Sequence, residues 1–247
     1  MNFDETLKNL CVHEELLTST EREQLRIDGY VLLENLLDSK TIETMNQVID
    51  RLFEQEGKEA GKEYIQEEGI KRLAALYNKD AIFDQIFTHP KILAATYSIL
   101  QQPFYLNLLN VRDVYKGKGE QIYHSDWGPR KDNNVAYAVN SIWMLDNFTN
   151  ENGATKLIPG THVLDTPSVY ELSKITNQEV QITGKAGSVL IFNAHLWHAG
   201  TQNKTDLRRR CIHNFYCVAS SKRKIHLSPS VRKQKDKATL SILGGIV

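Results

Sequence analysis

The pattern of apolar and polar positions divides the chain into a helical first part and a strand-rich second part. In the first hundred residues, apolar side chains recur at the three- and four-residue spacing of a single helix face. The clearest stripe is formed by Ile42, Met45, Ile49, Leu52 and Phe53. We expect this stripe to pack a helix onto the rest of the protein, with Asp38 or Ser39 as its capping residue.

Other elements are predicted on both sides of that helix. A helix capped by Thr20 is expected to run through Asp28 and end at Gly29, and residues 30–33 follow as a short strand. Residues 55–69 are charged and interrupted by glycines, which indicates a solvated loop or a frayed helix. Residues 80–87 and 90–100 predict two short helices, the second with proline at its first position.

From residue 103 onward the pattern changes to that of strands separated by turn residues. The predicted strands cover residues 104–115, 135–146, 155–158, 180–182, 188–193 and 209–218. Helices followed by strands favour an α+β fold, with helices on one side of an antiparallel barrel. We therefore expect one domain over residues 1–247. It comprises a largely helical part (1–102), a barrel core (103–218) and a Lys- and Arg-rich, solvated tail (219–247).

Composition and charge narrow the possible functions. The formal net charge is zero and the pI is about 7.1, so no overall basic field would attract nucleic acid or an anionic membrane. No apolar run approaches the length of a membrane span, and the segment Met1–Thr6 lacks the features of a secretion signal. The three cysteines form no Cys-x-x-Cys motif, which favours free thiols in a cytoplasmic protein. The sequence gives no indication of oligomeric state.

Three residues have the spacing of a metal site. His124 and Asp126 are two residues apart at the end of a predicted strand, so both side chains can point to the same side. His198 follows 198 − 124 = 74 residues later, on a strand that must return beside the first, as in a small barrel or jelly roll. Two histidines and one carboxylate form the facial triad that binds Fe(II) and leaves positions open. Three protein ligands also describe catalytic zinc, which remains the competing ion.

Three stretches of sequence around these residues are typical of one enzyme family. They are the opening segment Glu23–Tyr30, the Asn-Gly-Ala…Pro-Gly-Thr-His segment within 152–162, and the His-x-Gly-x-x-Asn…Arg segment that starts at residue 198. In these motifs the chain resembles the phytanoyl-CoA dioxygenase family of Fe(II)/2-oxoglutarate oxygenases, from about residue 23 to 216. The resemblance implies a double-stranded β-helix (jelly roll) with N-terminal helices. It also implies Fe(II), 2-oxoglutarate as cosubstrate, and O₂.

The resemblance also suggests how 2-oxoglutarate is held. Its far carboxylate needs a fixed cation, and the planar guanidinium of arginine can hold a carboxylate through two hydrogen bonds. The family places this arginine about eleven residues after the last histidine ligand, and 198 + 11 gives Arg209. If Arg209 points inward, the strand period directs Arg208 and Arg210 outward, where they are solvated or paired with acids. A one-residue bulge would reverse this assignment.

Five more residues are candidates for lining the site. By the resemblance, Trp143 aligns with a tryptophan of the cosubstrate pocket, with ordinary packing as the alternative. Asn110 could donate to the bound oxo-acid or be a plain strand residue. Arg72 lies where relatives often carry a basic residue that reaches toward the mouth of the site. Trp127 is expected to wall the substrate pocket, and His213, on the same strand face as Arg209, to line the cavity.

Three other side chains are expected to lie away from the metal. His162 belongs to the Pro-Gly-Thr-His turn and should brace that loop. His195 is three residues from His198 and so faces the opposite side of a strand, while Trp197 directly precedes the ligand and should pack elsewhere.

The expected function is oxidation of a small organic molecule by a dioxygenase that releases succinate and CO₂. Hydroxylation, desaturation and cyclisation remain open, because substrate placement decides among them. Halogenation is not expected, because relatives that halogenate have a small residue at the position of Asp126. The alternatives are a non-catalytic jelly roll that binds a small ligand and a metal-dependent hydrolase. The motifs do not identify the substrate, which could be an acyl-CoA thioester, an amino-acid derivative or another natural product.

Overall fold

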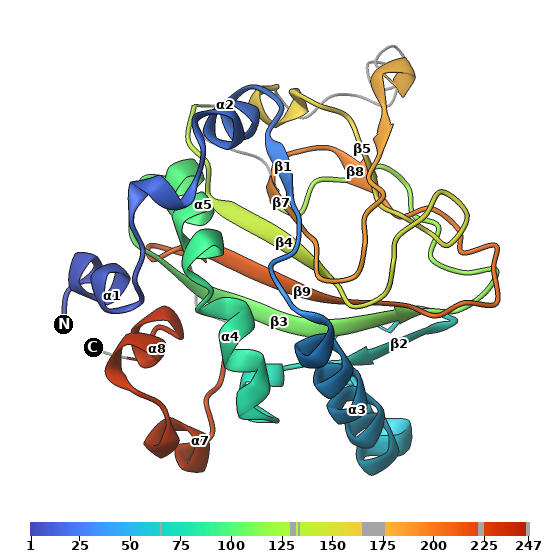
Figure 1. The fold of residues 1–247 in the computed structure, drawn as a ribbon, viewed down its shortest axis with the longest axis horizontal. Coiled ribbons are helices and arrows are strands. Elements are labelled where there is room, and N and C mark those ends of the chain that lie inside the picture. The colour runs from blue at the N-terminus through green and yellow to red at the C-terminus, as the bar shows by residue number, and fades with distance from the viewer. Residues whose placement is uncertain (65, 129–131, 133, 165–175, 222–224, 246–247) are drawn as a thin grey trace.

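Six antiparallel strands form the main sheet of the protein, seen here in a computed structural model (Figure 1). The model describes residues 1–247 except 65, 129–131, 133, 165–175, 222–224 and 246–247. The strand order is β1-β7-β4-β9-β3-β2. In chain order the strands are β1 (Tyr30–Leu33), β2 (Ile70–Leu73), β3 (Phe104–Val114), β4 (Ala138–Met144), β7 (Val189–Asn193) and β9 (Arg209–Val218).

A second, smaller sheet faces the first. It has the order β6-β5-β8 and consists of β5 (Lys156–Leu157), β6 (Val180–Gln181) and β8 (His198–Ala199). An isolated antiparallel bridge between His124 and His198 places His124 beside β8, at the edge of this smaller sheet. Apolar residues from both sheets, among them Ile142, Leu157 and Phe192, form a buried cluster between them. This arrangement of two facing antiparallel sheets is the jelly roll that we expected.

Helices cover the opposite face of the main sheet (Figure 1). The α-helices that precede the barrel are α1 (Phe3–Asn9), α2 (Ser19–Ile27), α3 (Ser39–Glu56), α4 (Asp84–Phe87) and α5 (Pro90–Leu100). Short 3₁₀ turns lie at Glu14–Leu16, Gly57–Glu59, Leu76–Asn78, Ala81–Phe83, Thr161–Val163 and Thr176–Gln178. Helix α5 packs on β4 and β7, and the main hydrophobic core fills the space between helices and sheet. The α+β prediction is therefore confirmed.

Local sequence explains where the main helices begin. Asp38 caps α3 by accepting from the Thr41 amide at 2.8 Å, as expected, and the predicted apolar stripe of α3 faces the core. The predicted cap at Thr20 is wrong by two residues. Thr18 accepts from the amide of Glu21, and Glu21 accepts from the amide of Thr18, which forms a capping box. The signal for that box is the Thr-x-x-Glu spacing.

Strand β2 is an element that the sequence pattern did not indicate. It pairs with the edge of β3 and brings Arg72 directly opposite Arg112. The charged segment 55–69 that precedes it starts in the last turn of α3, continues as the turn Gly57–Glu59, and then leads to β2. Arg72 lies at a buried strand position, which the polar composition of this region concealed.

The described part of residues 219–247 is folded onto the domain and is no solvated tail. They contain α7 (Pro229–Gln234) and α8 (Lys237–Ile242), while residues 222–224 and 246–247 lie outside the described part. Helix α8 packs on α1 and β3, and Ile242 is fully buried. The hydroxyl of Thr6 donates to that of Ser241 at 2.8 Å, which joins the two ends of the chain seen close together in Figure 1.

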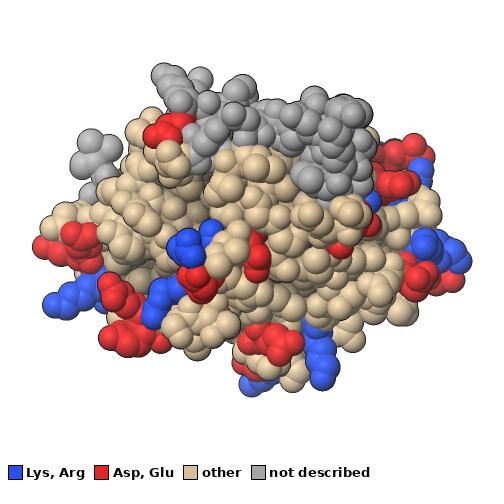
Figure 2. All heavy atoms as spheres, turned by 90° about the horizontal axis from the view of Figure 1, so that it is seen from above, with Lys and Arg blue, Asp and Glu red and all other residues tan. Residues whose placement is uncertain are grey.

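Charges of both signs are interspersed on the face seen in Figure 2, where neither sign forms a continuous patch. Among the described residues, the helices are all too short or too polar to cross a membrane.

Candidate metal centre and cosubstrate pocket

The three predicted metal ligands meet at one point. One potential ligand atom from each of His124, Asp126 and His198 lies within 4.8 Å of the others. Nε2 of His124 is 3.7 Å from one carboxylate oxygen of Asp126, and Nε2 of His198 is 3.6 Å from the other. The three side chains that the sequence spacing predicted to converge therefore lie close enough together to hold one metal ion.

Backbone pairing and short hydrogen bonds fix both imidazole rings. The amides and carbonyls of His124 and His198 exchange two hydrogen bonds of 3.0 Å. Nδ1 of His124 lies 2.9 Å from the carbonyl oxygen of Ile122, and Nδ1 of His198 lies 2.9 Å from that of Leu196. When each Nδ1 donates to its carbonyl, each Nε2 keeps a free lone pair, which is the form that binds a metal.

The carboxylate of Asp126 is fixed in a similar way. Its backbone amide donates to the carbonyl of Ala194 at 2.8 Å, which holds the residue beside the main sheet. The side-chain amide of Asn140, on β4, donates to Oδ2 of Asp126 at 2.7 Å. Because Asn140 orients the ligand without contacting the metal position, it acts as an outer support of the site.

The electrostatics of the three ligands fit a divalent cation. Burial lowers the pKa of the His198 imidazole, the charge of His124 lowers it further, and Asp126 opposes both. A neutral imidazole can coordinate a metal directly, whereas an imidazolium cannot. Two imidazole nitrogens and one carboxylate oxygen are a donor set that would suit Fe(II) and would leave positions open for other ligands.

A cavity of about 840 Å³ opens beside the ligands, between the two sheets. Strands β2, β3, β4 and β9 contribute inward-facing side chains to its wall. Among its lining residues are the three ligands and Tyr64, Glu67, Arg72, Asn110, Arg112, Asn140, Thr155, Arg209, His213 and Phe215. The space is large enough for 2-oxoglutarate and a further small molecule.

Arg209 points into this cavity and is almost completely buried. Its guanidinium lies 4.1 Å from the ring centre of Phe148 and donates to the hydroxyl of Thr155 at 3.3 Å. Within the described part of the chain, its Nε has no hydrogen-bond partner. Burial lowers the pKa of Arg209 to about 10, as expected for a buried cation without an anion beside it. The site therefore fits a ligand that carries a carboxylate.

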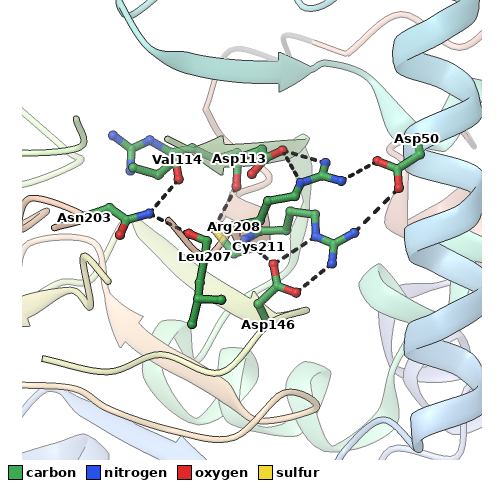
Figure 3. A network of polar contacts seen from close by, with 10 residues as sticks. Asp50, Asp113, Val114, Asp146, Asn203, Leu207, Arg208 and Cys211 are labelled. Carbon is green, nitrogen blue, oxygen red and sulfur yellow. Dashed lines mark hydrogen bonds and ion pairs between the residues drawn. The ribbon is translucent and has the colours of Figure 1, made fainter. Parts of the chain in front are cut away.

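Arg208 and Arg210 do not line the cavity, as expected if no bulge interrupts this end of β9. Figure 3 shows Arg208 directed at Asp113 and Asp50. Arg208 donates two hydrogen bonds to the buried carboxylate of Asp113 and one to Asp50 of α3. Arg210 binds Asp146 through its side chain and its backbone amide. These ion pairs fix the outer side of β9 at its start. The pairing of β9 with β3 runs from Val218 to Arg209 with one shift, between Leu106 and Leu108 of β3.

Three other predicted residues also line the cavity. Asn110 accepts from the amide of Ala75 at 3.2 Å, and its Nδ2 has no partner among the described residues. His213 faces the cavity, and its pKa is lowered well below the usual value by burial and then by Arg112 and the other nearby arginines. Arg72 lines the same cavity and lies over the ring of Tyr64 at 5.3 Å.

Trp143 and Trp127 do not line the cavity, contrary to expectation. Trp143 is fully buried on the helix side of β4, with its ring 5.5 Å from that of His89, because its neighbour Ile142 takes the inward position. This position agrees with the alternative interpretation of Trp143, which was ordinary packing in the core. Trp127 stacks on Tyr137 and on Phe215, and Phe215 is itself a lining residue.

The three side chains predicted to lie away from the metal do so. The ring of His162 packs against Gly29 and its Nε2 lies 3.2 Å from the carbonyl oxygen of Arg26, so it braces the turn between α2 and β1. Nε2 of His195 accepts from the amide of Tyr137 at 3.4 Å. Trp197 is absent from the residues that line the cavity.

Sequence reasoning missed several residues of this site. Asn140, Arg112 and Glu67 carry no motif, and their roles depend on partners far away in the sequence. For Asn140 and Arg112 a weak signal existed, since each is a polar residue at an inward position of a buried strand. Glu67 lies in a charged segment that gave no such signal.

Fold and site together define a class of protein, namely jelly-roll oxygenases that use a His-x-Asp…His metal centre. The sequence model of one family of this class, described as phytanoyl-CoA dioxygenase (PhyH), matches residues 25–211. The chain therefore belongs to the phytanoyl-CoA dioxygenase family.

The chain is also similar in sequence to individual proteins and in fold to solved structures. An uncharacterised protein of Mycobacterium tuberculosis, Rv1501, is 26% identical over 90% of this chain and 85% of its own length. Ectoine dioxygenase of Nocardia farcinica is 24% identical over 81% of this chain and 76% of its own. Crystal structures of EctD from S. alaskensis with bound Fe and of the carbocyclase SnoK from nogalamycin biosynthesis align with TM-scores of 0.72 and 0.69. Their identities are 18% and 16%, over 87% and 89% of this chain and 82% and 92% of theirs.

The protein is thus an Fe(II)/2-oxoglutarate-dependent dioxygenase, an oxidoreductase whose cofactors are Fe(II) and 2-oxoglutarate. Small-molecule substrates fit the relatives named above, among them ectoine dioxygenase.

Proposed function

We propose that His124, Asp126 and His198 hold Fe(II) and that Arg209 binds the far carboxylate of 2-oxoglutarate. The ligand atoms converge within 4.8 Å, and the buried guanidinium of Arg209 lines the same cavity. The single observation that carries the proposal is this combination of a complete ligand set with a buried, inward arginine that has no anionic partner among the described residues.

Each surrounding residue has a defined task in this proposal. Thr155 and the ring of Phe148 hold the guanidinium of Arg209 in place before the cosubstrate arrives. Asn110 offers its Nδ2, which has no partner among the described residues, to the bound oxo-acid. Asn140 fixes the rotamer of Asp126. Preorganised groups of this kind require little rearrangement on binding, which favours both affinity and a defined orientation.

Fe(II) bound at these ligands would supply the O₂ chemistry that converts 2-oxoglutarate to succinate and CO₂ and oxidises the substrate. The protein binds the reactants, orients them and excludes water from the cavity between the sheets. His213 stays neutral because burial and three arginines keep its pKa low, so it can accept or donate a hydrogen bond without adding charge. We assign His213 and Arg72 to the substrate side of the cavity.

We further propose hydroxylation, desaturation or cyclisation as the outcome, in a cytoplasmic protein. Asp126 fills the third ligand position, which supports an outcome other than halogenation. None of the three cysteines forms a disulfide, which supports a reducing compartment.

The proposal is tested by the metal and gas requirements of succinate formation from 2-oxoglutarate. We expect succinate only when Fe(II) and O₂ are both present, and none when Zn(II) replaces Fe(II). A hydrolase would instead keep its activity without O₂ and with Zn(II). A binding module would produce no succinate under any of these conditions, and either result would contradict the proposal.

A further inference from the structure

Two more arginines line the cavity next to each other. Arg72 of β2 and Arg112 of β3 are directly paired across the strands. The two residues are only 8% and 4% exposed. Both line the cavity. Glu67 bridges them, with one carboxylate oxygen on Nη2 of Arg72 and the other 2.9 Å from Nη2 of Arg112. Arg72 and Arg112 are therefore a buried pair of cations, held in place by Glu67, that faces the same cavity as the metal ligands.

This pair is held by different parts of the protein from those that hold Arg209. Arg209 is fixed by Thr155 and Phe148, on the side of the smaller sheet. Arg72 and Arg112 are fixed by Glu67 and by the ring of Tyr64, in the segment between α3 and β2. The cavity thus contains two separately supported cationic positions.

The sum of charges in the cavity shows that one negative charge is missing beside Arg72 and Arg112. If the function proposed above holds, Fe(II), Asp126, the 2-oxoglutarate dianion and Arg209 together are neutral. Glu63 also lines the cavity, but its side chain is 56% exposed and lies 3.7 Å from Lys79. Arg72, Arg112 and Glu67 then leave one positive charge, and buried charges are normally compensated.

The unpaired donors indicate where a compensating anion would bind. Glu67 occupies only the Nη2 atoms of the two guanidiniums. Nε of Arg72 and Nε of Arg112 are buried, and neither has a partner within the described part of the chain. Burial, and next the charge of Arg112, lower the pKa of Arg72 to about 10, so the pair favours an anion beside it.

We propose that Arg72 and Arg112 form a subsite for a single carboxylate carried by the substrate, separate from the 2-oxoglutarate anchor at Arg209. This inference rests on the proposed function, and it defines the substrate class as a small carboxylic acid. A carboxylate matches both the single missing charge and the planar donors of the guanidiniums. Glu67 is a positioning residue that holds the far side of both arginines and moderates their charge.

The test uses protein loaded with Mn(II) and saturated with 2-oxoglutarate, so that no turnover occurs. Benzoate and benzamide serve as probes of equal shape that differ in charge, and binding is measured by titration calorimetry. We expect one benzoate to bind per chain without releasing 2-oxoglutarate, and benzamide to bind at least about tenfold more weakly, because charge-assisted hydrogen bonds are lost.

Variants locate the benzoate site. Arg72→Met and Arg112→Met should each weaken benzoate binding by about ten- to a hundredfold and leave the affinity for 2-oxoglutarate nearly unchanged. Glu67→Gln, at a partly exposed position, should strengthen benzoate binding because it removes the competing negative charge. Lys71→Met is the matched control, since Lys71 is an exposed neighbour of Arg72 that packs on Phe53 and Tyr115. We expect it to change neither affinity.

Three results would overturn the inference. Benzoate could bind no better than benzamide, it could displace 2-oxoglutarate, or the Arg72→Met variant could lose 2-oxoglutarate as severely as Arg209→Met. Failure of the proposed function would look different, because Mn(II) or 2-oxoglutarate would then not bind to the unmodified protein.

Discussion

Replacement of Arg209 by methionine tests how the protein holds its cosubstrate. Methionine keeps much of the apolar stem that packs near Phe148 but removes the guanidinium. The far carboxylate of 2-oxoglutarate would then enter a pocket in which the side chain at 209 is almost completely buried and offers no cation. We expect a large loss of affinity for 2-oxoglutarate and a small effect on metal binding.

The expected magnitude follows from burial. Truncation of one partner of a buried, hydrogen-bonded charge pair costs roughly 2–5 kcal/mol. At about 1.4 kcal/mol per tenfold, this corresponds to about a thirty- to few-thousand-fold weaker binding of 2-oxoglutarate. Arg209→Lys should fall between the parent and the methionine variant, because lysine keeps the charge but loses the two-pronged geometry. The assay is calorimetric titration of 2-oxoglutarate into Mn(II)-loaded protein.

The neighbours of Arg209 provide matched controls. Arg208→Met and Arg210→Met remove the arginines on either side of Arg209, but each variant loses an outward ion pair, to Asp113 or to Asp146. We expect both variants to have lower thermal stability. Their affinity for 2-oxoglutarate should change by less than about threefold, because neither arginine lines the cavity. An equal or larger loss at either neighbour would refute the assignment of Arg209.

Three further predictions concern other parts of the molecule. Asn140→Ala removes the 2.7 Å hydrogen bond to Asp126 and should weaken metal binding by about ten- to a hundredfold, measured by metal titration; unchanged affinity would contradict its supporting role. Turnover in high chloride, with products analysed by mass spectrometry, should give no chlorinated product, because Asp126 occupies the position that chloride would need. Asp236→Ala removes the cap of α8 and should lower the free energy of unfolding by about 1 kcal/mol in denaturant titrations, whereas a solvated tail would show no change.

The candidate metal ligands and the inward arginine could be predicted from the resemblance to the family together with strand geometry. His124 and Asp126 are two residues apart, so any strand-like backbone directs them to one side. The same alternation separates Arg209 from its neighbours, and the structure contains no bulge at that end of β9.

Other features depend on contacts between distant segments, which no local pattern encodes. The inward or outward position of Trp143 depends on the register of β4 against β9, where Ile142 faces His213. The pairing of Arg112 with Glu67 requires that β2 add to the edge of β3. The burial of α8 requires its contact with α1, at the other end of the chain. In each case tertiary packing decides the environment of the residue.

Metal stoichiometry of the His198→Ala protein tests the central claim most directly. His198 is buried and fixed by its Nδ1 contact and its backbone bridge, so alanine removes one ligand while the bridge to His124 can persist. Titration with Fe(II) under anaerobic conditions should show one tightly bound ion per chain in the parent and a large loss of affinity in the variant. Iron bound as tightly by His198→Ala as by the parent would contradict the account.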